Sequence, residues 1–516
     1  MQWNPMSRRT FLRAGGAGTL AAAGLLGRSA GTADAETSVS LPLVPPSNAA
    51  AALAALGRTT LREPGSLPFP HLLPGADTLP QIQHIVMLMM ENHSYDNFLG
   101  TLQRSSANGP ADGFTMDPAA VTTWNPNGVL AGNPNGSGQY QWAYHMPTTC
   151  QHSGSPTQEW TASHEQYDNG KLDGFLTGVS YGSTAAGPVA MSYWNADDLP
   201  VLYSLASSFP LNDRWFCSLL GQTDPNRRYV IAATSAGMVD DIDVSTSVSS
   251  LLNERGLIQD LTLPLPGNGT IFDLLTLFGI SWKSYVAGGL TSATAELFPA
   301  DDLLNVATYK PFDDFFSDAA AGSLPAFSFL DENYSTQSQE NPQDIVVGEA
   351  LIHQVVTTLA DSPLWDSTML ILNYDEHGGY FDHVPPPVAM APDLIPPIVQ
   401  PGQLTYGGFT RFGFRVPALV VSPFARQDWV THTVHDHTSV LAMLERKWNL
   451  PALTWRDANA NDLMDFLDPV ALSTNSPRSF HALCPSLADP APSVCPATAP
   501  SLPLPGTYGS TPLPPH

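Results

Sequence analysis

Two pairs of polar residues in this chain could bind a metal ion. Glu91 and Asn92 directly follow the apolar run 85–90, and Asp375 and Glu376 follow a second apolar run in the same way. Such runs are typical of buried parallel strands, and ligands of open α/β sheets bind at the carboxyl ends of strands. A carboxylate there is costly to desolvate unless a cation offsets its charge. Oxygen ligands suit Ca²⁺, Mg²⁺ or Mn²⁺ better than Zn²⁺, so the sequence predicts a hard-metal site.

A hydroxyl residue at a predicted helix start could supply a nucleophile. Thr223 precedes Pro225, which fits the first turn of a helix, and an apolar helical stretch follows at 230–233. A helix N-terminus favours an anion, and a hydroxyl beside a divalent cation can attack phosphorus. Arg227 could then bind a phosphate oxygen. The alternative is a plain helix cap with a salt-bridged Arg227, just as the acidic pairs could be solvated turn residues.

Apolar runs and helical patterns predict the elements that position these residues. The predicted strands are 84–90, 369–374 and 416–421. Helical patterns cover 346–359 and the stretch from the capping residues 436–439 to about Trp448. Strands that alternate with helices favour a parallel α/β sandwich. Residues 105–200 lack strong periodicity and are predicted to form a long insertion or lid over the active face.

Composition limits the classes of partner. The chain has 516 residues, of which 43% are hydrophobic, and this is enough for a large core. Its 47 acidic and 21 basic residues give a net charge of −26, which disfavours nucleic acid as a partner. No later run of 18 uninterrupted apolar residues occurs, so we expect no transmembrane helix.

The N-terminus resembles an export signal. Arg8 and Arg9 are followed by Phe11 and Leu12 and then by an apolar stretch, and small residues precede Glu36. This pattern is typical of a twin-arginine signal peptide over residues 1–35, and the alternative is an ordinary basic leader. We therefore expect a secreted, periplasmic or cell-surface protein.

Three further segments complete the predicted organisation. Residues 36–78 form an Ala/Pro-rich arm, 79–485 the catalytic domain, and 486–516 a Pro-rich tail. Cys484 and Cys495 flank part of this tail and could pair after export, although the sequence leaves disulfide content open. Cys217 and Cys150 are the other two cysteines, and Cys217 has the apolar context of a buried thiol.

Four segments carry a family resemblance. They are Glu-Asn-His-Ser-Tyr-Asp at 91–96, Gly-Gln-Thr-x-Pro-Asn-Arg at 221–227, Tyr-Asp-Glu-His-Gly-Gly-Tyr-Phe-Asp-His-Val-Pro-Pro-Pro at 374–387, and Asp-His-Thr-Ser-Val-Leu at 436–441. Together with Arg-Asp-Ala at 456–458, they resemble the bacterial phospholipase C and acid phosphatase family of phosphoesterases. The similar segments run in order from about residue 84 to 466.

This resemblance implies a fold and a site. The implied fold is that of alkaline phosphatase and arylsulfatases, an α/β three-layer sandwich with a mostly parallel central sheet and long loop insertions. The implied nucleophile is the hydroxyl of Thr223. The implied ligands of a divalent cation are Glu91, Asn92, Asp375 and Glu376.

Several histidines are candidates for proton transfer. His152 lies in a segment that resembles the His-bearing segment of the family, and we expect it to assist the leaving group. His383 and His437 are further candidates, and the alternative for both is ordering a loop or capping a helix. His377 is expected to orient the acids beside it.

One segment departs from the family pattern. Residues 340–344 read Glu-Asn-Pro-Gln-Asp where the family often has His-Pro-Pro-x-Asp, so Glu340 replaces an expected histidine. Either another histidine supplies the proton, or the substrate has a good leaving group.

The sequence therefore predicts an exported, metal-dependent phosphoesterase. Thr223 would attack phosphorus, while Asn92 and Arg227 would stabilise the equatorial oxygens. Phospholipase C acting on phospholipid head groups is preferred, with acid phosphatase on soluble phosphomonoesters as the alternative. A non-catalytic metal-binding member of the family is a third possibility. The negative charge favours zwitterionic lipids or soluble esters over anionic bilayers, and the aromatic residues of 124–194 could provide an apolar surface for peripheral membrane contact.

Overall fold

The structure, a computed structural model, describes most of the predicted catalytic domain. The described residues are 44–114, 132–134, 139–151, 156–177, 187–241, 266–287, 306–334, 336–493, 495 and 511–512. The predicted export signal at 1–35 lies outside them, and so does His152.

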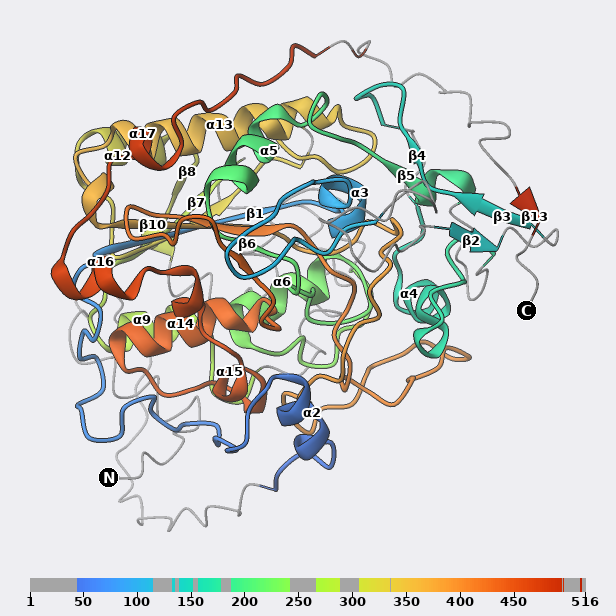
Figure 1. Cartoon of the computed structure of the whole chain (residues 1–516). Helices are drawn as coiled ribbons and strands as arrows, with labels where there is room; N and C mark the ends of the chain where they lie inside the picture. Colours follow the sequence, from blue (N-terminus) through green and yellow to red (C-terminus); the bar gives the residue numbers. More distant parts are fainter. Residues whose placement is uncertain are drawn as a thin grey trace, which may run out of the picture.

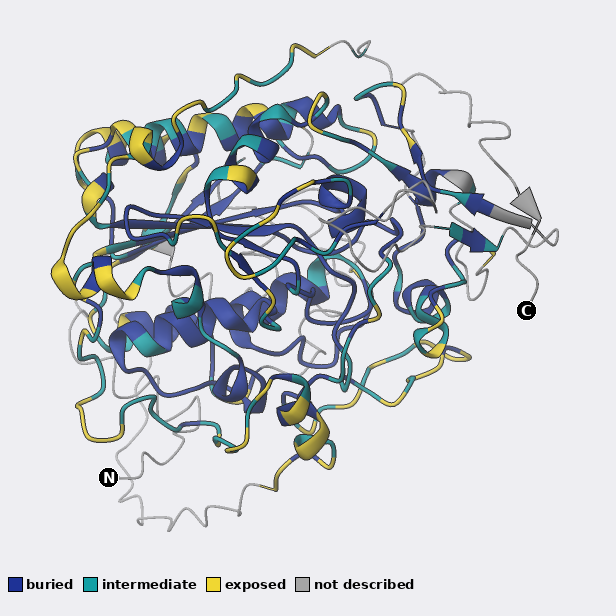
Figure 2. Ribbon diagram, viewed as in Figure 1, coloured by how far each residue is buried: buried dark blue, intermediate teal, exposed yellow. Residues whose placement is uncertain are grey.

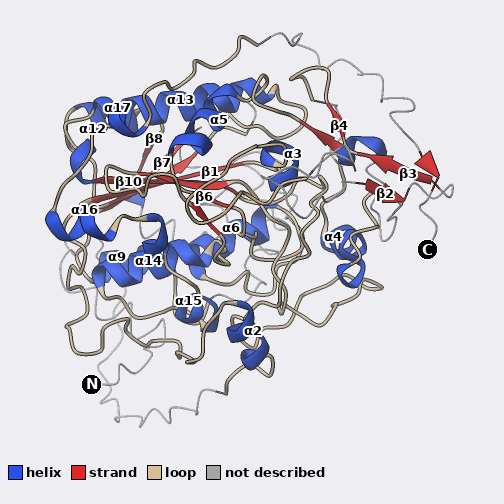
Figure 3. Ribbon diagram, in the orientation of Figure 1, coloured by secondary structure: helices blue, strands red, loops and turns tan. Residues whose placement is uncertain are grey.

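An eight-stranded sheet forms the middle layer of the fold (Figure 3). Its strands stand in the order β12-β6-β11-β10-β1-β9-β7-β8. They are β1 (His84–Met90), β6 (Leu211–Asn212), β7 (Trp282–Val286), β8 (Tyr309–Pro311), β9 (Phe327–Asp331), β10 (Thr368–Tyr374), β11 (Ala418–Val421) and β12 (Val430–Thr431). Neighbouring strands are parallel except where β11 pairs with β10 and β6. The mostly parallel α/β sandwich predicted from the sequence is confirmed.

Helices cover both faces of this sheet (Figure 1). On one face lie α5 (Pro200–Ser208), α12 (Asp314–Ala320), α13 (Ile345–Asp361) and α17 (Phe480–Leu483). On the other lie α6 (Thr223–Ala232), α9 (Ile271–Leu277), α14 (Thr438–Trp448) and α15 (Trp455–Asn459). Both helices predicted from the sequence, α13 and α14, are present. Figure 2 shows that the sheet and the inner sides of these helices form the buried core.

Smaller elements surround this sandwich. The short helices are α2 (Ala49–Ala55), α3 (Tyr95–Leu99), α4 (Trp160–Tyr167) and α16 (Pro469–Thr474). Two small sheets contain β2 (Gly132–Pro134), β3 (Gln139–Trp142) and β13 (Thr511–Pro512), and β4 (Tyr144–His145) and β5 (Ser192–Tyr193). Turns of 3₁₀ helix cover Asp168–Gly170, Gly187–Met191, Val306–Thr308, Trp365–Ser367 and Leu463–Phe466. Among the described helices, none has the length and apolar character that crossing a bilayer requires.

The register of the central strands aligns their carboxyl ends. Every β1 side chain from Ile85 to Met90 is buried, as expected for a strand covered on both faces. Met90 stands opposite Tyr374 of β10, and the N–H of Asp375 donates to the Met90 carbonyl at 3.0 Å. Because β9 is also parallel to β1, all three strands end on one side of the sheet. We call this side the carboxyl edge.

A disulfide joins Cys150 to Cys495, with a Cα–Cα distance of 5.5 Å. Pairing of Cys484 with Cys495, which the sequence left open, is therefore wrong. Cys484 ends α17 and is buried as a free thiol, as is Cys217. The tail from 485 runs along α13, and Ser493 contacts its N-cap residue Asp344 at 2.6 Å. It thus carries Cys495 along a helix of 17 residues, roughly 25 Å long, and away from Cys484.

Candidate active site

The carboxyl edge brings together the two polar pairs singled out in the sequence. The N–H of Asn92 donates to Asp375 Oδ1 at 3.1 Å, which links the turn after β1 to the turn after β10. Glu91 and Glu376 are also buried, with at most 1% of their surface exposed. The register of β1 and β10 places these two strand ends side by side.

Thr223 reaches this pair of turns from α6. It is the first residue of the helix, which confirms the predicted helix start, and Gln222 precedes it as the cap residue. Its Oγ1 lies 3.2 Å from Asn92 Oδ1 and 3.4 Å from Glu91 Oε2. The Thr223 hydroxyl therefore stands at the positive end of a helix dipole and beside two proposed metal ligands.

Arg227 follows Thr223 by one helical turn and is completely buried. Its guanidinium donates to Glu91 Oε1 at 2.6 Å and lies 3.4 Å from Asp375 Oδ2. Asp331 and Glu332, at the end of β9, lie 3.4 and 3.5 Å away. Arg227 therefore forms ion pairs with carboxylates. A salt-bridged Arg227 was the alternative to a phosphate-binding Arg227 in the sequence analysis.

The carboxyl groups at this edge carry more negative charge than Arg227 can balance. We call them the acidic cluster, which consists of Glu91, Asp331, Glu332, Glu340, Asp375 and Glu376. Burial and the neighbouring Asp375 raise the pKa of Glu91 and of Glu376 well above the usual value. Burial also raises the pKa of Glu332 to about 8. The cost of ionising these buried groups is the cost that a bound cation would remove.

Unpartnered oxygen atoms support the same conclusion. Glu376 Oε2 accepts a hydrogen bond from the N–H of Gly378 at 2.8 Å, but its Oε1 is buried without a hydrogen-bond partner among the described residues. Glu332 Oε2 is also buried without a hydrogen-bond partner among the described residues. Since buried polar atoms are nearly always paired, these oxygens fit a hard divalent cation. A second group of potential metal ligands consists of Cys150, Asp344 and Cys495. This group does not suit a cation, because its two cysteines form the disulfide.

The two strand-end turns fit together through unusual backbone conformations. Asn92 has a φ of 62°, and Gly378 has a φ of 63°. A Cβ atom on Gly378 would lie only 1.9 Å from the Asn92 carbonyl oxygen. Glycine is therefore required at 378 both for its conformation and for the close approach of the turn that carries Asn92.

His383 lies in a network of buried ion pairs. Its Nδ1 is 2.7 Å from Asp96 Oδ2, and its Nε2 is 3.3 Å from Asp112 Oδ1. Arg415 donates to Asp96 and to Asp382, each at 2.9 Å. Burial opposes the charge of His383, but the two carboxylates outweigh it and raise the pKa of His383 to about 9. These contacts order the loop that carries His383, which was the alternative to a catalytic role.

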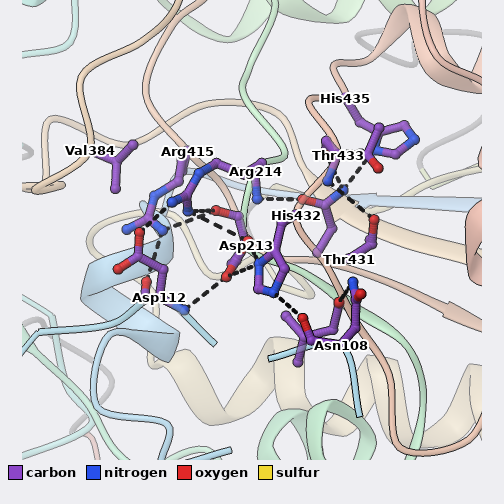
Figure 4. A network of polar contacts seen from close by, with 12 residues as sticks. Asn108, Asp112, Asp213, Arg214, Val384, Arg415, Thr431, His432, Thr433 and His435 are labelled. Carbon is purple, nitrogen blue, oxygen red and sulfur yellow. Dashed lines mark hydrogen bonds and ion pairs between the residues drawn. The ribbon is translucent and has the colours of Figure 1, made fainter. Parts of the chain in front are cut away.

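Figure 4 shows how this network continues along the carboxyl edge. Asp112 contacts Arg214 at 2.6 Å. Asp213, which directly follows β6, lies 2.9 Å from His432, which directly follows β12. Arg415 donates to the backbone carbonyls of Asp112 and Asp213 at 2.9 and 3.1 Å. Each carboxylate in this network lies beside a basic side chain. The network therefore holds loops together without an excess of negative charge.

His437 and His377 hold the turn after β10. His437 is buried, its Nε2 donates to the Asp375 carbonyl at 2.6 Å, and burial lowers its pKa. His377 Nε2 lies 2.8 Å from Gln166 Oε1, and its Nδ1 is 3.0 Å from Glu376 Oε2. Burial lowers the pKa of His377 to about 3. His437 therefore supports the strand end that carries the proposed metal ligands Asp375 and Glu376. His377 lies beside Glu376, as expected from the sequence.

Three residues of the acidic cluster were missed in the sequence as site residues. Asp331 is the last residue of β9 (Phe327–Asp331) and Glu332 directly follows it, so recognition of this strand would have revealed both. Glu340, noted only as a departure from the family pattern, lies against Asn92. Burial and Asp375 raise the pKa of Glu340 to about 7. The residue in the place of the expected histidine thus belongs to the site.

Comparison with known proteins gives consistent matches. A family model described as the Phosphoesterase family matches residues 82–451. Phospholipase C A of Mycobacterium tuberculosis is 31% identical over 428 residues, which cover 75% of this chain and 77% of the relative. Non-specific phospholipase C1 of Arabidopsis thaliana is 30% identical over 415 residues, which cover 75% and 70%. A solved structure in the alkaline phosphatase superfamily, from Vibrio parahaemolyticus, aligns at a TM-score of 0.30 with 15% identity, covering 62% of this chain and 71% of that chain.

We predict that Gly378→Ala strongly destabilises the protein. The new Cβ would collide with the Asn92 carbonyl and would also strain a left-handed residue, at a combined cost of roughly 3–5 kcal/mol. Gly57→Ala is the matched control, because Gly57 has a φ of 67° but open space around its Cβ position. It should cost only about 1 kcal/mol. The free energy of unfolding in urea measures both, and equal losses would contradict the role assigned to the close approach.

A second prediction concerns pH. Because the pKa of His383 is raised from about 6.5 in the unfolded chain to about 9, its ion pairs stabilise the fold fully below about pH 6.5. This contribution, on the order of 3 kcal/mol, is lost as the pH rises through 9. The stability difference between wild type and His383→Gln should therefore be largest near pH 6 and shrink toward pH 9.5. His481→Gln, at an exposed site on α17, is the control. A difference that does not change with pH would refute the assignment.

Proposed function

Because the chain belongs to the Phosphoesterase family, we propose that it is an exported, metal-dependent phospholipase C with Thr223 as its nucleophile. The protein is a hydrolase that acts on phosphoester bonds. The observation that carries the finer proposal is the position of the Thr223 hydroxyl, 3.2 Å from Asn92 at the N-terminus of α6. Export is inferred from the twin arginines within residues 1–35.

The proposed reaction proceeds in two displacements at phosphorus. The Thr223 hydroxyl loses its proton to solvent, and its oxygen forms a bond to phosphorus while the bond to the leaving alkoxide breaks on the opposite side. His152 would give that alkoxide a proton. Water then hydrolyses the phosphothreonine and returns the free hydroxyl. The N-terminus of α6 and the Asn92 amide lie beside Thr223, where they would stabilise charge on the equatorial oxygens.

The acidic cluster supports a divalent cation as part of this proposal. Glu91, Asn92, Asp375 and Glu376 would hold the ion, which would favour the alkoxide form of Thr223 and polarise the phosphoryl oxygens. Ca²⁺, Mg²⁺ and Mn²⁺ all suit these oxygen ligands. We propose Arg227 as a fixed countercharge, because its guanidinium contacts the carboxylates of four residues in the acidic cluster.

A phospholipid is the substrate best supported by the relatives, since both of those compared are phospholipases C. The competing predictions from the sequence are an acid phosphatase for soluble phosphomonoesters and a non-catalytic metal-binding protein. Rates on a choline phosphodiester and on a simple phosphomonoester distinguish the first two. Absence of turnover on either would support the third.

We predict that Thr223→Ala lowers kcat on the choline phosphodiester by at least about 1,000-fold, because it removes the attacking oxygen. Thr223→Ser keeps a hydroxyl and should retain a measurable fraction of the wild-type rate. Unfolding in urea should show that both variants fold. Turnover of the Ala variant at the wild-type rate would eliminate Thr223 as the nucleophile.

Removal of divalent cations should abolish activity and lower stability. A cation that binds only the folded state at 100 times its dissociation constant contributes about 2.7 kcal/mol to the free energy of unfolding. After dialysis against EDTA, we expect this loss together with loss of turnover, and restoration of both by Ca²⁺, Mg²⁺ or Mn²⁺. Glu376→Gln should weaken the restoration. Full activity after exhaustive chelation would contradict the proposed metal dependence.

A further inference from the structure

One loop near the active site exposes apolar side chains on its outer surface. We call residues 393–405, which follow the turn after β10, the rim loop. Leu394 is 79% exposed, Ile398 45% and Leu404 62%. In the described part of the chain only seven large apolar side chains are exposed to this degree, and three of them stand on these thirteen residues. Such a concentration marks an interaction surface.

The exposure of these side chains does not come from a loose loop. Burial alternates along 393–400, so that even-numbered residues are exposed and odd-numbered residues are half-buried. Ile398 is the least exposed of the three apolar residues, because part of its side chain lies against Gly237. Val399 and Tyr406 pack against a buried cluster that includes Trp160. Tyr406 also stacks on His164 with ring centroids 4.1 Å apart. One side of the loop therefore packs against the protein. Leu394, Ile398 and Leu404 remain exposed among the described residues.

Hydrogen bonds join the rim loop to residues 237–240, near the proposed active site. The N–H of Ile398 donates to the Gly237 carbonyl at 2.8 Å, and Gln403 Nε2 donates to Asp240 Oδ2 at 2.8 Å. The next residue, Asp241, accepts from the N–H of Asp224, directly beside Thr223, at 2.8 Å. The rim loop thus flanks the end of α6 that carries the proposed nucleophile.

Helix α4 supports the loop from its other side. Trp160 Nε1, on α4, donates to the Leu404 carbonyl at 2.8 Å. Figure 1 shows the orange loop after β10 running beside α4, and Figure 2 shows an exposed stretch there. In contrast to the exposed rim loop, two of the aromatic residues in 124–194 that the sequence suggested for membrane contact, Trp160 and Trp194, are buried.

The charge of the rim loop indicates its partner. Asp393 is its one charged residue, and its carboxylate accepts a hydrogen bond from Thr234 at 2.7 Å. The loop has no Lys or Arg, and the whole chain carries a net charge of −26. Anionic bilayers attract basic segments, so this combination of an uncharged apolar loop on an acidic protein fits a zwitterionic surface.

We propose that Leu394, Ile398 and Leu404 insert into the head-group region of a zwitterionic phospholipid bilayer and hold the Thr223 site against it. This inference rests on the proposed phospholipase C function, for which it names the surface that meets the lipid. Three apolar side chains that leave water together favour the bilayer without any need for basic residues.

The test replaces the three side chains by serine, in Leu394→Ser/Ile398→Ser/Leu404→Ser. We expect binding to phosphatidylcholine vesicles in a sedimentation assay, and hydrolysis of those vesicles, to fall by at least about tenfold. Turnover of a soluble choline phosphodiester should stay at the wild-type level. Adding phosphatidylglycerol to the vesicles should weaken binding of the wild type.

Leu72→Ser/Leu73→Ser/Val470→Ser is the matched control. It removes three exposed apolar side chains. The carbonyls of Leu72 and Leu73 accept hydrogen bonds from Asn449, at the end of α14 opposite to His437, which contacts the carboxyl edge. Vesicle binding of this control should equal that of the wild type. Equal losses in both triple variants, or unchanged binding of the rim-loop variant, would overturn the proposal. So would stronger binding to anionic vesicles.

Two further outcomes keep this inference separate from the proposed function. If the wild type turns over neither the vesicles nor the soluble diester, the proposed function fails, while the sedimentation assay still decides whether the rim loop binds lipid. If the rim-loop variant changes the oligomeric state in size-exclusion chromatography and leaves vesicle binding intact, the loop is a contact between copies of the chain. That result would overturn the inference.

Discussion

The arrangement of this molecule depends on how buried carboxylates at the carboxyl edge are neutralised. Arg227 lies among four of them, and it is completely buried. A buried ion pair adds little net stability, but its loss leaves uncompensated charge in a low dielectric, which is strongly unfavourable. Because Arg227 and Thr223 share one face of α6, the pairing that anchors the helix also sets the position of the hydroxyl. Charge neutralisation and placement of the proposed nucleophile are therefore one constraint.

A second ion-pair network fixes the loops around this centre. Asp96 belongs to α3, the short helix after β1, and Asp382 to the loop after β10, and Arg415, just before β11, binds both. His383 adds its charge to the same carboxylates and is thereby held in place. The two networks have different balances of charge. The one around Arg415 is nearly neutral within itself, whereas the acidic cluster has an excess of carboxylates, and only the latter calls for a further cation.

The sequence predicted those features that local pattern determines. The runs that form β1 and β10 are mostly apolar, so both strands and the polar pairs after them were recognisable. The helix start at Thr223 followed from Pro225. Features set by tertiary packing were not predictable in this way. Whether a histidine such as His437 meets water or a backbone carbonyl depends on elements distant in sequence, and the partner of Cys495 depends on the path of the tail along α13.

The excess of negative charge in the acidic cluster also constrains how a phosphate ester can enter the site. A phosphate group approaching Glu91 and Glu376 would be repelled unless a cation stood between them, because like charges in a buried site interact strongly. The electrostatics of the described residues thus support the proposed metal dependence. The same argument applies at longer range, since a chain with a net charge of −26 gains nothing from electrostatic attraction to a phospholipid surface. Attraction to such a surface would then have to come from apolar contact, and the rim loop offers exposed apolar side chains near the proposed nucleophile.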